Sequence, residues 1–295
     1  MFLIIVSLII ILLILNILLT IYYLYKKNYK LFYISLTRTL FIYILIKLYC
    51  VYCNNIQICV FDSGIPGATI VAMATIHGNE PAGSYALEEV VDMFTSGELK
   101  VTKGKVIILP CLNKGGRMLN MRYQPQQILE FKFFNIDANR NYPKKGEYSS
   151  KCDISTKVID IVKKSNYVYD CHEAYGTLNK DGPDSMGNGI YPGKGDVSIN
   201  LCNNIVEDIN KIKYETTPKT NIDYRTYQVV EDWDEIEGSL RNYCNEHKIN
   251  YVLIESPGQN NVQPLKDRII QNKIGFLSFM KNIDSDVFKV IGIQL

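Results

Sequence analysis

The chain has 295 residues, enough for one α/β domain with a large core and an additional segment. Its formal net charge at pH 7 is +2, with 21% charged and 47% hydrophobic residues. No basic cluster lies outside the N-terminal segment, so the composition argues against nucleic acid as the main partner.

The first residues predict a membrane helix. Residues 2–25, FLIIVSLIIILLILNILLTIYYLY, carry no charge and are long enough to cross a bilayer at about 1.5 Å per residue. A cleaved signal peptide is the alternative, but no basic residue precedes the stretch, which also exceeds the usual hydrophobic region of such a peptide. We expect a membrane anchor over 1–55 and a separate domain over 56–295.

A second apolar stretch, TLFIYILIKLYCVYC, follows at 39–53. A basic connector precedes it and holds four cations: Lys26, Lys27, Lys30 and Arg38. The positive-inside rule places this connector in the cytoplasm. The stretch is short and contains Lys47, so it can span the membrane, lie in the interface or belong to a hairpin. One span would leave the domain in the cytoplasm, and two would carry it to the other side.

The eight cysteines do not decide the compartment. They are scattered, and the pair Cys50 and Cys53 has no second pair to complete a structural zinc site, so we expect reduced thiols. No Asn-x-Ser/Thr sequon occurs, which counts weakly against a glycosylated lumenal domain.

The stretch ATIHGNEPAG, residues 74–83, joins a predicted strand to a predicted helix. GATIVAMATI at 67–76 is a β-branched, apolar run typical of a buried strand, and PAGSYALEEVVDMF at 81–94 has apolar positions at helical spacing. His77 and Glu80 lie between them, where ligands bind at the strand ends of α/β sheets. A metal is one such ligand. The alternative is a histidine packed at a helix start beside a solvated acid.

From about residue 56 onward, strand-like and helix-like runs alternate. The strand-like runs are 105–112, 165–174 and 249–257. The helix-like runs are 154–165, 197–212 and 265–283. This alternation predicts one α/β domain, with a largely parallel sheet and helices on both faces. The glycine-rich region 175–196 is expected to form the rim of an active site.

His172 lies at the end of a predicted strand, in YDCHEA, and Glu173 should point to the opposite face because successive side chains alternate. His172 is therefore the better candidate to join His77 and Glu80. Two imidazoles and one carboxylate leave a fourth position for water, which is typical of a catalytic zinc site. A core histidine is the alternative for His172. The remaining histidine, His247, lies near a polar helix end and is expected at the surface.

Three further residues are candidates for catalysis. Glu255, in VLIESPG, ends another predicted strand and would face the same crevice, where an apolar wall would raise its pKa toward that of a general base. A carboxylate that caps a loop is the alternative. Arg122, in NMRYQ, could stabilise the oxyanion formed when water adds to a carbonyl, and Arg117 is its alternative.

The motif NIDANRNYP, residues 135–143, predicts an anion site. Arginine offers a planar fork that matches a carboxylate, and an adjacent asparagine adds a neutral donor, so Asn139 and Arg140 could hold an anionic substrate end. Asp137 is expected to brace this loop rather than to react.

In this order, HGNE, NRNYP, the histidine of DCHEA and a strand-end glutamate resemble the zinc metallocarboxypeptidase family, including its succinylglutamate desuccinylase/aspartoacylase branch. The resemblance covers roughly residues 56–283. It implies a three-layer α/β/α sandwich with a central mixed, mostly parallel sheet. It also implies the roles of seven residues: zinc on His77, Glu80 and His172, Glu255 as general base, Asn139 and Arg140 on the substrate carboxylate, and Arg122 as the oxyanion group.

Three segments depart from the family's pattern. The turn CLNKGG lacks the usual proline and aspartate ahead of the oxyanion arginine, which loosens the assignment of Arg122. GSLRNY resembles the segment of the specificity pocket and puts Leu240 there, but Trp233 stands where a substrate-contacting tyrosine is usual. Tyr224 or Tyr227 could substitute for it. QICVFDSGIPGATIV leaves room for only a brief first hairpin.

The motifs predict a membrane-anchored zinc hydrolase that cleaves an amide bond next to a free carboxylate. A metallocarboxypeptidase is the first interpretation, because NRNYP favours a peptide C-terminus. An N-acyl amino acid deacylase is the alternative with the same chemistry. A catalytically silent fold that binds a peptide at the membrane is the alternative from another class, although the retained Glu255 and metal ligands argue against it. The expected partners are one Zn²⁺, a peptide or N-acyl amino acid with a free carboxylate, and membrane lipid.

Overall fold

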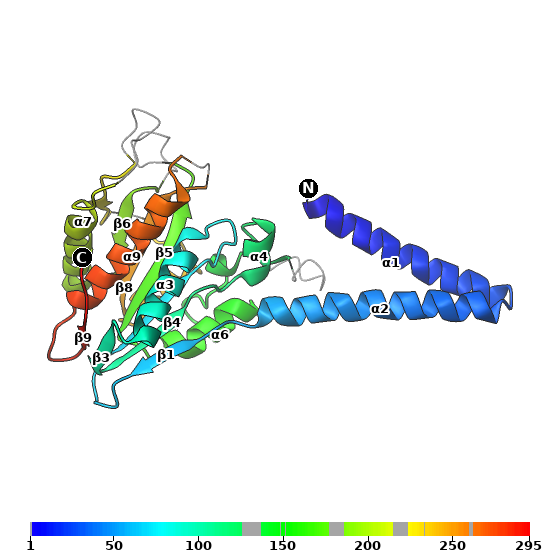
Figure 1. Ribbon diagram of the computed structural model, residues 1–295, viewed down its shortest axis with the longest axis horizontal. Helices are drawn as coiled ribbons and strands as arrows, with labels where there is room; N and C mark the ends of the chain where they lie inside the picture. The colour runs from blue at the N-terminus through cyan, green and yellow to red at the C-terminus, as the bar shows by residue number, and fades with distance from the viewer. Residues whose placement is uncertain are drawn as a thin grey trace.

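A computed structural model describes residues 2–125, 137–147, 149–150, 152–176, 186–214, 224–232, 234–259 and 262–295. The chain has two parts, an N-terminal pair of long helices and an α/β domain (Figure 1). The pair projects from the domain, and the turn between its two helices lies at the far end.

The apolar N-terminal segment forms α1, Phe2–Tyr25, and α2, Tyr29–Asn54, which a short turn connects. The Asn28 side chain accepts a hydrogen bond from the backbone N–H of Leu31 at 3.3 Å and so caps the start of α2. α2 begins well before the apolar stretch predicted at 39–53, so most of the expected basic connector is helical. The two apolar stretches are therefore two full-length helices that form a hairpin.

The domain is built on a mixed, mostly parallel sheet of seven strands. Their order across the sheet is β1 (Cys59–Asp62), β4 (Lys105–Leu109), β2 (Thr69–Ala74), β5 (Tyr167–Ala174), β8 (Asn250–Pro257), β6 (Gly189–Pro192) and β7 (Gln228–Val229). The four strands from β4 to β8 are parallel, and β1 and β6 are antiparallel to their neighbours β4 and β8. A second sheet pairs β3 (Lys100–Lys103) with β9 (Lys289–Ile291).

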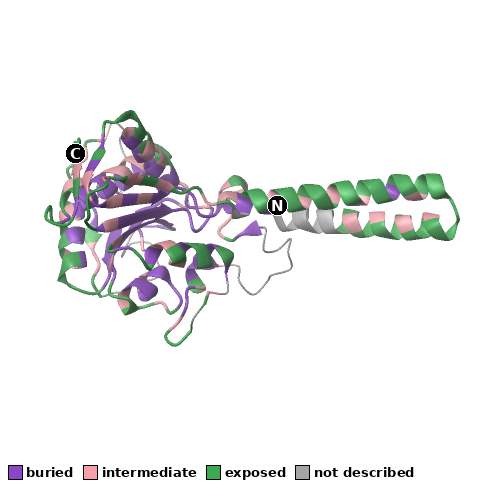
Figure 2. Cartoon of the chain, turned by 90° about the horizontal axis from the view of Figure 1, so that it is seen from below, coloured by how far each residue is buried: buried purple, intermediate pink, exposed green. Residues whose placement is uncertain are grey.

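Helices cover both faces of the sheet, as the sequence predicted. One face packs against α3 (Ala82–Ser96), α7 (Asp196–Ile209) and α9 (Leu265–Lys281), and the other against α6 (Asp153–Val162) and α8 (Leu240–Glu246). Strand β2 serves both cores because its side chains alternate: Ile70 and Ala72 join the first core, and Val71 and Met73 join the second. Figure 2 shows the buried strands between helices whose outer sides are exposed. The fold is thus the expected three-layer α/β/α sandwich.

Two short elements, α4 (Lys114–Leu119) and the 3₁₀ helix η2 (Ala138–Arg140), lie in connections that follow β4. The long parallel strands β5 and β8 pair so that His172 lies opposite Glu255. This register brings two of the predicted site residues to the same end of the sheet.

Two details differ from the expectations. The segment before β2 forms no hairpin with it: β1 pairs with β4, because both edges of β2 are taken by the parallel strands β4 and β5. The region 175–196 is more than a rim loop, since it contains β6, which pairs with β8. Residues 177–185 of that region lie outside the described residues.

A buried ion pair joins β5 to the helices of the first face. Glu173 on β5 and Arg268 on α9 are in contact and are 1% and 5% exposed. The other carboxylate oxygen of Glu173 accepts a hydrogen bond at 2.5 Å from the backbone N–H of Ala82, where α3 begins. Its negative charge therefore lies at the positive end of that helix. As predicted from strand alternation, Glu173 points away from the face that carries His172.

We expect Arg268→Met to lower the free energy of unfolding by about 3–5 kcal/mol, because it leaves the buried carboxylate of Glu173 without its cationic partner. Lys273→Met is the matched control on the same helix: its ion pair with Glu89, at 2.7 Å, is partly exposed. The control should cost no more than about 1 kcal/mol. Denaturant unfolding of the detergent-solubilised chain measures both, and equal losses would contradict the assigned role of the buried pair.

Candidate active site

The turn after β2 carries the first two predicted site residues. Thr75 has a φ of 57°, in the left-handed region, and its hydroxyl donates to the backbone oxygen of Glu80 at 3.0 Å. A Cβ at Gly78 would lie 2.0 Å from the carbonyl carbon of Gly116 on α4, so only glycine allows this approach. The tight turn holds the His77 and Glu80 side chains at the carboxyl end of the sheet.

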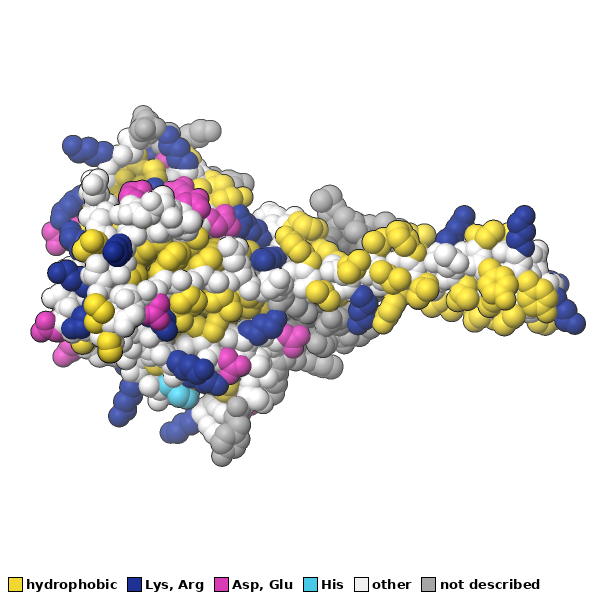
Figure 3. All heavy atoms as spheres, turned by 60° about the horizontal axis from the view of Figure 1, so that its bottom comes forward, with side chains coloured by type: hydrophobic (Ala, Val, Ile, Leu, Met, Phe, Trp, Pro, Cys, Tyr) yellow, Lys and Arg dark blue, Asp and Glu magenta, His cyan; other side chains and the backbone are white. Residues whose placement is uncertain are grey.

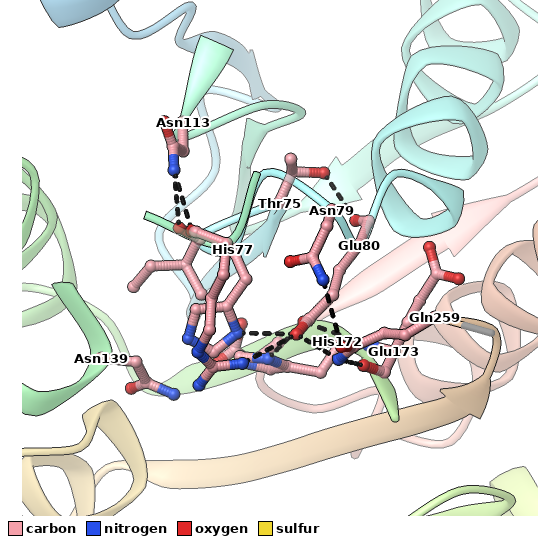
Figure 4. Close-up of polar contacts among 12 residues, drawn as sticks. Thr75, His77, Asn79, Glu80, Asn113, Asn139, His172, Glu173 and Gln259 are labelled. Atoms are coloured by element: carbon pink, nitrogen blue, oxygen red, sulfur yellow. Dashed lines mark hydrogen bonds and ion pairs between the residues drawn. The ribbon is translucent and has the colours of Figure 1, made fainter. Parts of the chain in front are cut away.

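His77, Glu80 and His172 converge on one point. The potential ligand atoms of these three buried residues lie within 4.8 Å of one another. Nδ1 of His77 is 2.8 Å from Oε1 of Glu80, and Nδ1 of His172 is 2.9 Å from Oε2 (Figure 4). Two imidazole nitrogens and a carboxylate form a donor set that could hold one metal ion. The structure thus brings together the three residues that the sequence named as ligands.

A carboxylate lies behind each imidazole. Nε2 of His77 is 3.2 Å from Oδ1 of Asp137, and Nε2 of His172 is 3.3 Å from Oδ2 of Asp170. Tyr251 donates its hydroxyl hydrogen to Asp170 at 2.8 Å. Such outer partners fix the orientation of metal-binding histidines and raise their basicity. The sequence analysis did not identify Asp170, although its place two residues before His172 puts both on one face of the strand.

Charges within the site keep the Glu80 carboxyl ionised. Burial alone would raise its pKa, but the imidazoles of His77 and His172 outweigh burial and hold the pKa below its usual range. For His172, burial acts to lower the pKa, yet the carboxylates of Asp170 and Glu80 outweigh it and raise the pKa well above its usual value. The cluster of His77, Glu80 and His172 therefore favours positive charge beside the Glu80 carboxylate, as a metal-binding site does.

Glu255 lies at the end of β8, opposite His172 in the strand register, and is 7% exposed. Its Oε2 has no hydrogen-bond partner among the described residues. Burial raises the pKa of Glu255 well above its usual range, although the charge of His172 opposes the rise. A buried carboxyl with a raised pKa and an unpaired oxygen is suited to accept and release a proton.

The structure separates the two candidate arginines. Arg122 donates to Glu80 at 3.3 Å and, through two nitrogens, to Asp137 at 3.2 Å, and it lines the cavity beside the candidate metal ligands. Arg117 points elsewhere: its guanidinium donates to Glu88 at 2.6 Å. Within the described part of the chain, only the first of these two arginines lines the cavity.

Asn139 and Arg140 lie on η2 and both line the cavity. Oδ1 of Asn139 accepts a hydrogen bond at 3.0 Å from the backbone N–H of Leu240, which leaves its amide group as a donor for a ligand. A Cβ at Gly238 would lie 2.6 Å from the backbone oxygen of Arg140, so the two segments make close contact. Asp137 accepts from the Asn139 N–H at 3.0 Å and braces this loop, as expected.

The cavity has a volume of about 270 Å³, and its wall differs from the expected one at Leu240. The Leu240 side chain is fully buried in the second core and does not line the cavity, whereas its neighbour Arg241 does. The first residue of α8 faces the sheet, so the next one turns toward the cavity. Arg122, Arg140 and Arg241 thus contribute three guanidinium groups to a wall that also contains the carboxyl groups of Glu255 and Asp234.

The expected substitutes for a substrate-contacting tyrosine do not line the cavity. Tyr227 is 2% exposed and donates its hydroxyl hydrogen to Ser256 at 3.1 Å or Gln271 at 2.8 Å in the first core, and Tyr224 is also buried. Trp233 lies outside the described residues. Among the described residues, the tyrosines that line the cavity are Tyr175, Tyr191 and Tyr251.

Gln259, just after β8, is a second residue that the sequence analysis did not identify. Its amide nitrogen donates to Oε1 of Glu80 at 2.9 Å, and its amide oxygen accepts from Asn79 at 3.1 Å (Figure 4). It also contacts the backbone oxygen of Glu173. An uncharged side chain in a loop carries no sequence signal for this role.

Comparisons with known proteins agree with the fold. Protein-family models give no match to the sequence, and curated proteins give none either. Among solved structures, product-bound cell shape determinant protein Csd4 from Helicobacter pylori matches with a TM-score of 0.57 and 19% identity, over 80% of this chain and 56% of Csd4. Another Csd4 structure is described as that of a D,L-carboxypeptidase.

Two further structures match across the domain. The ectoine utilization protein EutE (DoeB) from Ruegeria pomeroyi has a TM-score of 0.53 and 15% identity, over 79% of this chain and 61% of that protein. A succinylglutamate desuccinylase from a Silicibacter species has a TM-score of 0.51 and 15% identity, over 77% and 60%. This chain therefore spans less than two thirds of each of these proteins. It has the fold of these carboxypeptidase-like and desuccinylase proteins, which is the fold that its motifs predicted.

Proposed function

We propose that the chain is a zinc-dependent hydrolase that cleaves an amide bond next to a free carboxylate. The observation that carries this proposal is the convergence of His77, Glu80 and His172 within 4.8 Å, in a cavity that Glu255 and Arg140 also line. Candidate metal ligands, a buried carboxyl that can act as a base and an arginine that can bind an anion thus line one cavity. Hydrolysis of an amide bond beside a carboxylate requires this combination.

The donor set suits zinc. Two imidazoles and one carboxylate are a frequent catalytic zinc set that keeps a position open, and Asp137 and Asp170 supply the outer partners typical of such sites. Zinc, when bound, supplies Lewis acidity that polarises a carbonyl and lowers the pKa of water.

The chain's own residues divide the remaining chemistry. Glu255 accepts a proton from the attacking water as the water oxygen bonds to the carbonyl carbon. It holds that proton until the C–N bond breaks and the leaving nitrogen takes it. Arg122 stabilises the negative charge that develops on the carbonyl oxygen. Arg140 and the amide of Asn139 hold the substrate carboxylate, which sets the distance from the anchored end to the bond that is cleaved.

A carboxypeptidase is the first candidate, because the Asn139–Arg140 pair faces the cavity as a receptor for a C-terminal carboxylate. An N-acyl amino acid deacylase is the second, because the cavity of about 270 Å³ is small and has three arginines, which favours a compact substrate with more than one carboxylate. The two candidates are distinguished by comparing turnover of peptides that have a free C-terminal carboxylate with turnover of N-acyl aspartate and N-acyl glutamate. Binding of both classes with turnover of neither would support the silent, peptide-binding alternative.

The proposal includes a membrane anchor. Tyr29–Cys53 is long and apolar enough to cross a bilayer, with a mean hydropathy of 1.6 in its most apolar window. Only 11% of that window is buried, unlike the core helix of a soluble protein. Within α1, the part whose side chains the structure describes, Ile11–Tyr25, is a shorter apolar helix. The hydrolase domain would therefore act at a membrane surface.

We expect the full chain in detergent to bind one zinc ion and His172→Ala to lose it, because one of three protein ligands is removed. His247→Ala is the matched control, since His247 stacks on Tyr243 at the end of α8, away from the site. Elemental analysis after dialysis measures the ratio of metal to protein. Stoichiometric zinc in His172→Ala would contradict the assigned ligand set.

Glu255→Gln should retain zinc but lower kcat by about 10²- to 10⁴-fold, because an amide cannot accept the proton. The base must be deprotonated, and burial raises its pKa, so wild-type kcat/KM should rise with pH as Glu255 ionises. That rise should be missing in Glu255→Gln and present in Glu88→Gln, which changes an acid outside the cavity. A pH–rate profile measures it, and an unchanged rise in Glu255→Gln would assign the base elsewhere.

Arg140→Lys keeps the charge but loses the planar fork, so we expect weaker selectivity for a free carboxylate over its amidated analogue. The expected loss is about 1.5–3 kcal/mol, which corresponds to roughly tenfold to a hundredfold in the ratio of kcat/KM values. Arg117→Lys is the matched control outside the cavity and should leave the ratio unchanged. Full selectivity in Arg140→Lys would pass the anchoring role to Arg241.

A further inference from the structure

The hairpin has the dimensions of a pair of membrane spans. α1 contains 24 residues and α2 contains 26. At 1.5 Å per residue they are about 36 Å and 39 Å long, and the hydrocarbon core of a bilayer is about 30 Å thick. By length, each helix can therefore cross a bilayer by itself, with about half a turn to one turn left at each end.

Polar side chains of the hairpin lie between the two helices. Oγ1 of Thr20 is 2.8 Å from Oγ of Ser35, and the Ser35 hydroxyl donates to the backbone oxygen of Asn16 at 3.1 Å. Ser35 is only 5% exposed. Small polar residues that bond across an interface are typical of helices that associate in lipid. The contact also fixes α1 and α2 as one antiparallel unit.

The outward sides of α2 and of Ile11–Tyr25 in α1, where the structure describes side-chain burial, are apolar and uncovered. Leu18 on α1 is 56% exposed, and Phe41 and Leu48 on α2 are each 60% exposed. Figure 3 shows hydrophobic side chains along the hairpin and cations at its tip. A continuous apolar surface of this length is unfavourable in water and favourable in a bilayer.

Aromatic and basic residues mark the two ends. The tip carries six aromatic residues and three lysines: Tyr22, Tyr23, Tyr25, Tyr29, Phe32, Tyr33, Lys26, Lys27 and Lys30. The domain end of α2 carries Tyr49 and Tyr52. Aromatic belts at both ends and lysines at one are typical of spanning helices, and the lysine-rich end lies in the cytoplasm.

Two cations inside α2 are compatible with a span. Arg38 lies in the half of α2 nearer the tip and Lys47 in the half nearer the domain, so each long side chain can extend toward its own interface. Nζ of Lys47 is 5.8 Å from the ring centroid of Tyr43. Both cations are thus placed where lipid-embedded helices tolerate them.

We infer that α1 and α2 cross the bilayer together as an antiparallel hairpin, with the Lys26–Lys30 tip at the cytoplasmic face and the α/β domain at the opposite face. The inference stands on the hairpin and does not need the proposed chemistry. With the proposed function, it means that the substrate carboxylate is met outside the cytoplasm.

The connection to the domain and the cysteines agree with this location. Cys50 and Cys53, in the last turns of α2, are 2% and 0% exposed, and Nζ of Lys114 on α4 lies 5.7 Å from the ring centroid of Tyr52. The end of the span is thus packed into the domain and holds it close to the bilayer surface. All eight cysteines are free, and all except Cys59 are buried, so packing would shield seven of the thiols in an oxidising compartment.

Protease sensitivity of the full chain, with a tag after Leu295, tests the inference in a bacterial host. We expect protease to degrade the tagged domain in intact spheroplasts and to leave it protected in sealed, inverted membrane vesicles. The reverse pattern would overturn the inference, as would release of the chain from membranes by alkaline carbonate. Zinc content and turnover measured on the same material in detergent report the proposed function separately.

Two variants make the test specific. Deletion of residues 29–48 removes most of the second span and should leave the domain protected in spheroplasts; unchanged sensitivity would exclude α2 as a span. Lys26→Glu/Lys27→Glu/Lys30→Glu should reduce the fraction of chains with an exposed domain, because the tip loses its cytoplasmic signal. Lys163→Glu/Lys164→Glu/Lys248→Glu is the control, with the same charge change on exposed lysines of the domain. An equal effect of the two triple variants would contradict the assigned role of the tip.

Discussion

The buried Glu80 carboxylate is the constraint on which the rest of the site depends. It is 2% exposed, and an ionised group at that depth is stable only when positive charge and hydrogen-bond donors surround it. The donors come from separate parts of the chain: His77 on the same turn, His172 and the Glu173 N–H on β5, and Gln259 after β8. The parallel strands β2, β5 and β8 end at the same edge of the sheet, and this brings these donors together around Glu80.

The short helix α4 joins this site to the N-terminal hairpin. On one side Gly116 packs against Gly78 in the ligand turn, and the Asn113 amide donates to the backbone oxygens of Ile76 and Arg122 at 3.4 Å and 3.3 Å. On the other side α4 contacts the end of α2. α4 therefore contacts both the ligand turn and the end of the hairpin.

The charge pattern of the cavity sets what it can accept. Arg122 is held by Glu80 and Asp137, so its charge is already balanced within the protein. Arg140, Arg241 and the buried Glu255, whose pKa is raised, line the same cavity. In the proposed hydrolysis, the arginines would hold the substrate carboxylate and Glu255 would transfer the proton.

Local patterns were sufficient to predict the helices α1, α3, α6, α7 and α9, the strands β2, β4, β5 and β8, and the residues at the ends of these strands. His77, Glu80, His172 and Glu255 follow apolar runs directly, so parallel alignment alone brings them together, as the structure confirms geometrically. The choice of Arg122 over Arg117, the burial of Leu240 with Arg241 in its place, and the pairing of β1 with β4 depend on the tertiary structure. The direction of a loop or helix-start side chain is decided by partners distant in sequence, such as Glu88 for Arg117 and the second core for Leu240. The sequence by itself determined which residues reach the end of the sheet, and tertiary packing decided which of their neighbours face the cavity.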